Sequence, residues 1–533
     1  MVVTNTTKNI AKGVSILGIT GLICKVVGLL FSIPLNMIHS DAVAANEIAT
    51  LFYKVYPTYT LLLTVSSAGL PVAVSRLVAG FMARGDSVSV KKTFKVALMM
   101  LVCLGAFCSL LMLILNGFLS AVYVNDADAS LGFYMIAPCV LFVCVLSAFR
   151  GFIQGQQNML PTAVSQLIEQ VGKVFVSLPL AYIGVHVYNS RAMGAAGALL
   201  GLTISEAAAM LYMIIRFYFR KKEYNTLPQT SSDPSMDSRE LLRRLILISI
   251  PITINACIIP LSNFIDSHMM TRRMMDAGLT WEAADHAYGA FQSVVIRFIN
   301  IPTALALAIA MNLVPAVSAR RALNDDEGVR AESNTGLRYA FLIGFPCTVG
   351  MSLLSHQAVA FFYEGTFPAE KLQLSSDLLT WQSLTIVLFT VVQAASGILQ
   401  GIRRQKIPMY AMLVGVGLKI LLNYILIGTP GINIFGGPIA SIVCYSAAMV
   451  ITLYYSCRYT KMKFNWMDWI LRPGLASSVM GIAVYTLSRI LPGGRLSTVI
   501  EIFAGIVIFA AAAVMLKAVS LDELRKMLKR GRK

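Results

Sequence analysis

Arg297 is the residue that most needs a chemical explanation, because it lies inside a stretch that is otherwise apolar enough to cross a bilayer. The stretch covers residues 288–318, and Arg297 lies about 14 Å from its start at about 1.5 Å of helix per residue. A guanidinium at that depth costs about 2.5–3.5 kcal/mol on insertion scales. It therefore requires either a structural ion pair with another helix or a wet cavity that attracts an anion.

Other ionisable residues also fall deep within apolar stretches. Lys25 lies about 22 Å into the first stretch, and Lys54 about 9 Å from the far end of the second. Lys25 and Arg297 have no acid at helical spacing, so we expect them to face an aqueous cavity and bind an anion. Lys54 is a third candidate ligand, with snorkelling to the outer interface as its alternative.

Glu169 and Lys173 are four residues apart with the acid first, the favourable order for an ion pair on one helix face. A self-compensating pair and a cavity role are therefore both open for them. The other polar residues that we expect to line a cavity are Gln166, Gln170, Asn255 and Asp266. Prolines interrupt several stretches, and kinks there would let helices bend, although prolines are common in membrane helices. The candidate hinges are Pro71, Pro251, Pro260 and Pro302.

The elements that must position these residues are transmembrane helices. Of the 533 residues, 57% are hydrophobic and 13% are charged, and the mean hydropathy is +0.71. Soluble proteins carry about 25% charged residues, so the composition predicts an all-α integral membrane protein. About fourteen spans are expected, near residues 10–34, 48–80, 94–118, 131–153, 161–186, 194–218, 242–270, 288–318, 337–362, 377–401, 408–428, 436–457, 470–490 and 497–518.

Loop charge predicts the orientation of these spans. Basic residues concentrate in the loops after even-numbered spans, which places both termini in the cytoplasm by the positive-inside rule. The net charge of +18 is thereby assigned to topology and anionic lipid headgroups, with no nucleic-acid partner. The polar connection around 220–240 reads as a cytoplasmic linker. The expected domains are an N-terminal lobe (1–219), this linker, a C-terminal lobe (241–460), and a last helix pair with a basic tail (461–533).

A repeat relates the two lobes. Gly151, Gln154 and Gly155 after span four match Gly397, Gln400 and Gly401 after span ten at a constant offset of 246 residues, and Lys173 matches Lys419 at the same offset. Both copies leave the membrane on the same side, so the sequence predicts two parallel six-helix repeats followed by two extra helices.

Several kinds of chemistry find no support in the sequence. The nine cysteines lie scattered in apolar stretches without a C-x-x-C pair, and the five histidines form no metal-binding motif. No phosphate-binding loop or nucleophile elbow occurs. We therefore expect no metal, no cofactor and no enzymatic activity.

The chain resembles the multidrug/oligosaccharidyl-lipid/polysaccharide exporter superfamily, in the branch that contains stage V sporulation protein B and the lipid II flippase MurJ. The resemblance covers nearly the whole chain. The segments that carry it are CKVVG (24–28), YKVYP (53–57), RGFIQGQQNMLPTAVSQLIEQ (150–170) and RFINIP (297–302). The MurJ pattern has a cation three residues before a glycine in the first span and an arginine five residues before a proline in the eighth. Lys25 and Arg297 match it, whereas Phe31 and Thr60 stand where further arginines are expected.

The resemblance implies that these cations bind the diphosphate of a polyprenyl-linked sugar in a central cavity. The expected function is a bacterial plasma-membrane flippase that moves an undecaprenyl-diphosphate-linked peptidoglycan precursor to the outer leaflet by alternating access. Membrane lipids are further partners, and any coupling ion is unspecified. The departures at Phe31 and Thr60 favour the sporulation-protein-like branch and leave the sugar open. Alternatives are a flippase for another lipid-linked polysaccharide and a cation-coupled multidrug exporter of the same fold.

Overall fold

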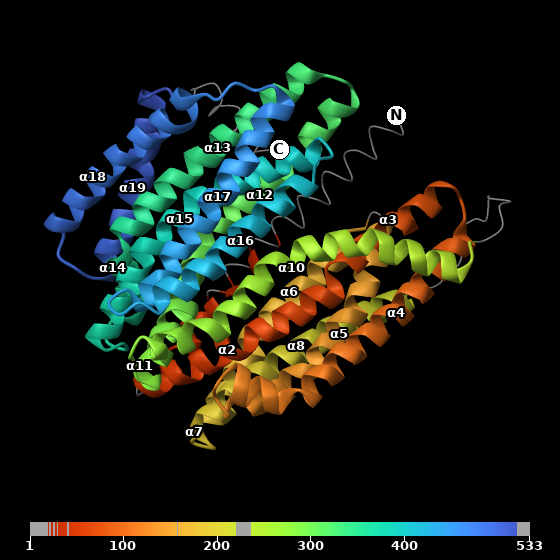
Figure 1. The fold of residues 1–533 in the computed structure, drawn as a ribbon, viewed down its shortest axis with the longest axis horizontal. Coiled ribbons are helices and arrows are strands. Elements are labelled where there is room, and N and C mark those ends of the chain that lie inside the picture. Colours follow the sequence, from red (N-terminus) through yellow and green to blue (C-terminus); the bar gives the residue numbers. More distant parts are fainter. Residues whose placement is uncertain are drawn as a thin grey trace. The chain divides into compact units, whose positions relative to one another are not determined.

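The computed structural model describes residue 20 and residues 23–24, 27–28, 30–39, 42–156, 158–219 and 236–519, and this part of the chain is helical without a strand. Thirteen helical segments in it are long and apolar enough to cross a membrane. Figure 1 shows these helices in sequence colours. The predicted all-α membrane fold is therefore confirmed. The first predicted span, 10–34, falls largely outside the described residues.

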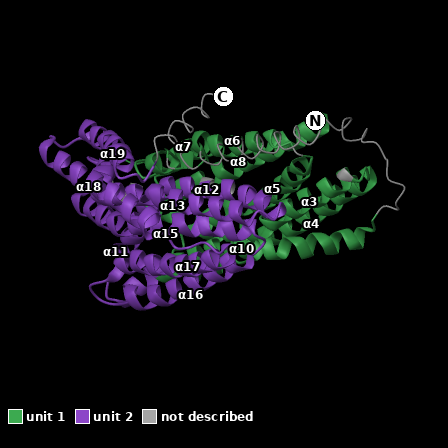
Figure 2. Ribbon diagram, turned by 90° about the horizontal axis from the view of Figure 1, so that it is seen from above, with its two compact units in different colours: residues 1–269 green, residues 270–533 purple. Residues whose placement is uncertain are grey.

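The chain divides into two compact units, residues 1–269 and 270–533, which Figure 2 colours separately. The boundary falls within one helix, α10 (Ser238–Asp276). The other helical segments of the first unit are α2 (Ala42–Ser67), α3 (Gly69–Ala83), α4 (Ser87–Ile114), η1 (Phe118–Tyr123), α5 (Ala129–Gly155), α6 (Leu160–Gly172), η2 (Lys173–Ser177), α7 (Leu178–His186) and α8 (Arg191–Phe219). The predicted lobe boundaries at 219 and 241 were placed by counting six spans for each lobe, and they stay a prediction.

The second unit contains the later spans. Its segments are α11 (Trp281–Gly289), η3 (Ala290–Val295), α12 (Ile296–Ala322), α13 (Asp326–Leu353), α14 (Ser355–Tyr363), α15 (Ala369–Gly401), α16 (Lys406–Ile427), η4 (Asn433–Phe435), α17 (Gly436–Thr460), η5 (Met467–Leu471), α18 (Arg472–Ile490) and α19 (Arg495–Met515). Four segments of the described chain, η1, η2, η3 and η5, are π-helical turns.

One helix forms the centre of each unit. In the first, α5 packs against α2, α3, α4 and α8; in the second, α15 packs against α12, α13 and α17. Each is the most buried of the spans described in its unit. A helix that is apolar on all sides suits such a position, because it meets other helices on every face. These two helices are the fourth and tenth predicted spans, which the repeat pairs with each other.

The matched glycines of the repeat make equivalent contacts in the two units. A Cβ at Gly151 of α5 would lie 2.7 Å from the carbonyl oxygen of Pro71, and one at Gly155 would lie 2.7 Å from Cβ of Val78, both in α3. The two helices therefore approach more closely here than any larger residue on α5 would allow.

In the second unit, a Cβ at Gly397 of α15 would lie 3.0 Å from the carbonyl oxygen of Ala310, and one at Gly401 would lie 2.8 Å from Cβ of Val317, both in α12. Ala310 and Val317 follow their first-unit counterparts, Pro71 and Val78, by the same number of residues. The sequence repeat is thus a repeated helix contact as well.

The turn after this contact is repeated too. Gly85 and Asn324 both take the left-handed backbone conformation, with φ of 73° and 54°. The residues that follow them, Asp86 and Asp325, cap α4 and α13 by accepting a hydrogen bond from the backbone N–H three residues on, at 2.9 and 2.7 Å. Such caps satisfy an N–H that the first turn of a helix leaves unpaired.

The predicted hinge prolines lie within helices or beside a break. The second span bends at Ala68, three residues before Pro71, where α2 ends and α3 begins. Pro251 and Pro260 lie inside α10, and Pro302 lies inside α12. A hinge function for these prolines stays a prediction.

Candidate functional site

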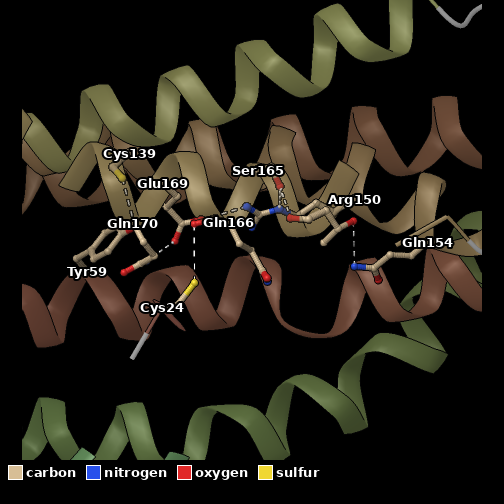
Figure 3. Close-up of polar contacts among 10 residues, drawn as sticks. Cys24, Tyr59, Cys139, Arg150, Gln154, Ser165, Gln166, Glu169 and Gln170 are labelled. Atoms are coloured by element: carbon tan, nitrogen blue, oxygen red, sulfur yellow. Dashed lines mark hydrogen bonds and ion pairs between the residues drawn. The ribbon is translucent and has the colours of Figure 1, made fainter. Parts of the chain in front are cut away.

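A group of interacting polar side chains that includes predicted site residues lies between α5 and α6 of the first unit (Figure 3). Arg150 of α5 donates from Nε to Oγ of Ser165 at 2.9 Å, and its Nη2 lies 3.1 Å from Oε2 of Glu169. The Arg150 and Glu169 side chains are 14% and 24% exposed. A largely buried arginine therefore has a charged partner and a neutral one on the neighbouring helix.

The helical repeat explains how these residues meet. Ser165 and Glu169 are one turn apart on α6, so both side chains lie on the same face. On α5, Gln154 is one turn after Arg150, and its Nε2 lies 3.5 Å from Oγ1 of Thr162. Polar contacts at two successive helical turns, from Arg150 and from Gln154, thus join α5 to α6.

Glu206 adds a buried carboxyl group from α8. Its residue is 4% exposed, and its Oε2 has no hydrogen-bond partner within the described residues. Glu169, Arg150 and Lys173 are charged groups close enough to interact with it electrostatically. We call Arg150, Ser165, Glu169, Lys173 and Glu206 the first-unit polar cluster.

Lys173 is held among aromatic rings. Its Nζ lies 4.7 Å from the ring centre of Phe31, 5.0 Å from that of Tyr56 and 5.9 Å from that of Phe52. Lys173 is 9% exposed and begins the π-helical turn η2. The faces of aromatic rings attract a cation, so they offset part of the cost of burying the ammonium group.

Four of the predicted cavity residues lie along α6 and at the start of η2. Gln170 donates to Oε1 of Glu169 at 3.2 Å, and the backbone oxygen of Gln166 accepts a weak bond from the thiol of Cys24 at 3.9 Å. Glu169 and Lys173 complete the four. The pairing of Glu169 with Arg150 was not predicted, because the two residues are separated by a loop.

Lys54, a predicted diphosphate ligand, lies in a different buried ion pair. Its Nζ is 3.6 Å from Oδ2 of Asp126, and the two side chains are 1% and 3% exposed. Arg191 extends the network, at 3.3 Å from Asp126 and 2.6 Å from the more exposed Asp128. A ligand role for Lys54 stays a prediction.

The remaining predicted residues lie on other segments. Lys25 is outside the described residues. Asn255 is exposed on α10, whereas Asp266 on the same helix is 2% exposed. Arg297 is half-buried in the second unit, in the first turn of α12 and directly after the π-helical turn η3. Turns of this kind occur often at functional sites. Its predicted role with Lys25 as an anion clamp stays a prediction.

Lys371 was missed in the sequence. It is 9% exposed in the first turn of α15, its ammonium lies 3.4 Å from the ring centre of Phe367, and Nζ has no hydrogen-bond partner among the described residues. The predicted span began at residue 377, which left Lys371 in a loop. An aromatic residue four positions before the lysine was the available signal.

Comparison with known proteins identifies the family. The model of the polysaccharide biosynthesis protein family matches residues 10–320. The chain belongs to this family. A second model, MatE, matches residues 251–425 of the chain. Together with the relatives below, these matches place it in the multidrug/oligosaccharidyl-lipid/polysaccharide exporter superfamily, in the branch of MurJ and stage V sporulation protein B.

Several relatives come from Bacillus subtilis (strain 168). The protein is 25% identical over 519 residues to lipid II flippase MurJ, covering 94% of this chain and 93% of the relative. It is 24% identical over 451 residues to stage V sporulation protein B, covering 85% and 83%.

Solved structures share the fold. A structure of lipid II flippase MurJ in an inward closed conformation matches with a TM-score of 0.66 at 15% identity, covering 93% of this chain and 97% of that one. An inward-facing multidrug resistance MATE family transporter matches with a TM-score of 0.65 at 14% identity, covering 83% and 98%. Family, spans and fold agree that this is a multipass membrane protein.

Proposed function

We propose that the protein is a flippase for a lipid-linked sugar, and that its substrate is an undecaprenyl-diphosphate-linked peptidoglycan precursor. The observation that carries this proposal is the similarity to a relative named lipid II flippase MurJ along 94% of this chain and 93% of the relative. The substrate would move from the inner to the outer leaflet of a bacterial plasma membrane by alternating access, without a covalent step.

The anion-binding role belongs to Arg297 and Lys25. Arg297 offers a planar set of donors that suits two oxygens of a phosphate group. Its half-buried position after a π-helical turn supports such a role. The first-unit polar cluster supplies groups that can hydrogen-bond a sugar, since its Arg150 and Glu169 side chains keep some exposure.

Membrane potential is one driving force available in this scheme. An inside-negative potential favours outward movement of an anion by about 2.3 kcal/mol per charge per 100 mV, less the contribution of any cation that moves with it. The proposal leaves open whether a coupling ion contributes as well.

Complementation tests the role of Arg297. In a strain depleted of its own lipid II flippase, we expect wild-type protein to restore growth and Arg297→Ala to fail, because the anion loses its bidentate partner. Arg297→Lys keeps the charge and should restore growth partly, and Lys25→Ala should fail.

The control is Arg495→Ala, which removes an exposed arginine from the first turn of α19. It should restore growth fully at equal membrane abundance. Full growth with Arg297→Ala at normal abundance would rule out the anion role. A leaflet-resolved assay of labelled precursor in vesicles would then decide whether transport itself persists.

A cation-coupled multidrug exporter is the second candidate. The MatE match over residues 251–425 and the buried Glu206 favour it, since exporters of this kind rely on a carboxyl group inside the membrane. Sodium- or proton-driven efflux of a cationic dye from vesicles, lost in Glu206→Gln, would support this function over the first.

A further inference from the structure

A basic pocket lies at one end of the second unit, apart from the residues assigned to transport. Its cavity measures 170 Å³ and is lined by Arg321, Arg330, Arg404 and Lys461, with Asp326 as the one acidic residue. Since a water molecule takes up about 30 Å³, the cavity has room for about six waters or for one phosphate group.

Four elements supply these cations. Arg321 lies in the last turn of α12 and Arg330 near the start of α13. Arg404 follows α15, and Lys461 ends α17 in a left-handed conformation with φ of 54°. The pocket is therefore formed by the packing of the unit and is not a single charged loop.

The charges in the pocket do not cancel. Asp326 accepts from Nη1 of Arg321 at 2.7 Å, which uses the one carboxylate. The C-terminal ends of α12, α15 and α17 contribute about half a negative charge each. The N-terminal end of α13, where Asp326 and Arg330 lie, adds about half a positive charge. Three negative half-charges and one carboxylate against four cations and this helix end leave an excess of about 2 positive charges, which suits a phosphate monoester or diester.

One cation is held in place before any ligand arrives. The guanidinium of Arg404 lies 4.8 Å from the ring centre of Tyr459, which also lines the pocket. Stacking on a ring fixes the plane of a guanidinium and leaves its N–H groups free to bind oxygens. A fixed donor loses less conformational entropy when it binds.

The internal repeat argues against a purely topological role. When the two units are aligned on the repeated contacts, Arg321 corresponds to Met82, Arg404 to Asn158 and Arg330 to Lys91. If the main purpose of these cations were to compensate helix dipoles, the equivalent helix ends of the two units would carry the same cations. At two of these three matched positions, those of Arg321 and Arg404, the second unit alone carries a cation.

We propose that this pocket, made by Arg321, Arg330, Arg404 and Lys461, binds a phosphate group. The group can come from an anionic phospholipid headgroup or from free phosphate. A second cavity, of 530 Å³, shares Arg321 and Ile402 with the pocket and offers room for the rest of a headgroup.

Calorimetry on the purified full-length protein in an uncharged detergent tests the proposal. The probes are dihexanoyl-phosphatidylglycerol, dihexanoyl-phosphatidylcholine and inorganic phosphate. We expect saturable binding of phosphatidylglycerol that weakens about tenfold or more in the double variant Arg404→Gln/Lys461→Gln, because two charge-assisted contacts are lost.

The control is Arg458→Gln, which removes an exposed arginine from the same end of α17 that does not line the pocket. It should bind like the wild type. Saturable binding of inorganic phosphate with the same loss in the double variant would support free phosphate as the source.

Three results would overturn the proposal. These are no saturable binding of either anionic probe, saturable binding of phosphatidylcholine as tight as that of phosphatidylglycerol, or an equal loss in Arg458→Gln. Thermal unfolding of each variant without ligand shows whether it is folded, so that a loss of binding is assigned to the pocket.

Discussion

At the scale of single residues, three buried charges of the first unit have partners that are distant in sequence. Glu169 has Arg150 across a loop, Lys173 has aromatic rings, and Lys54 has Asp126. The sequence could show that these charges were buried, because depth follows from position in a span. It could not show their partners, because those depend on how helices pack.

Arg150 and Glu169 should stabilise the fold as a pair, so the effects of mutating them should be coupled. We expect Arg150→Ala to lower the midpoint of thermal unfolding, because it leaves a largely buried carboxylate without its cation. Adding Glu169→Gln should recover part of this loss, with a coupling energy of about 1–3 kcal/mol in a double-mutant cycle.

The control pair is Arg244 and Glu240 of α10, whose side chains are 45% and 41% exposed. Water already solvates both, so Arg244→Ala should change the midpoint little. Strictly additive effects at Arg150 and Glu169 would contradict the prediction.

At the scale of helices, glycine contacts fix how α5 meets α3 and how α15 meets α12. The sequence predicted this in part, because the matched glycines stood out at a constant offset. It did not reveal the partner residues or the repeated turn, since these match at a different offset from the glycines and only some of them, such as Val78 and Val317, are identical, whereas Pro71 and Ala310, or Gly85 and Asn324, differ. The common property is backbone geometry.

Alanine should therefore be harmful at these glycines. We expect Gly155→Ala and Gly401→Ala each to cost about 1–3 kcal/mol, because the new Cβ would lie 2.7 or 2.8 Å from a valine Cβ and the helices must separate. Thermal unfolding in detergent measures the effect.

Two other helical glycines, Gly80 and Gly417, are matched controls. A Cβ at either would have no neighbour within 4 Å. Alanine there should leave stability unchanged or slightly higher, because alanine favours helix. Equal losses at all four positions would show that helix contact is not the cause.

At the scale of the whole molecule, the charge of the loops predicts how the protein lies in the membrane. The span count followed from composition and length, because hydrocarbon thickness sets a minimum run of apolar residues. The π-helical turns and the break at Ala68 did not follow, since hydropathy reports side-chain polarity and not the hydrogen-bond pattern of the backbone.

Cysteine labelling checks the orientation. A membrane-impermeant maleimide should label Asn189→Cys and Gly431→Cys in intact cells, and should label Gly85→Cys and Arg403→Cys only after permeabilisation, because basic loops stay in the cytoplasm. The unsubstituted protein gives the background from its nine native cysteines. The reverse pattern would contradict the predicted topology.

The repeated turn and helix contact also carry a historical meaning. Two copies of one ancestral segment, produced by gene duplication, would retain the contacts and turns that fix the backbone while side chains at other positions diverged. Here both copies have the glycine contacts and the aspartate caps. In contrast, Met82 and Asn158 are the residues at the positions that correspond to Arg321 and Arg404. In a transporter with such ancestry, the differences between the copies identify where each half acquired its own task.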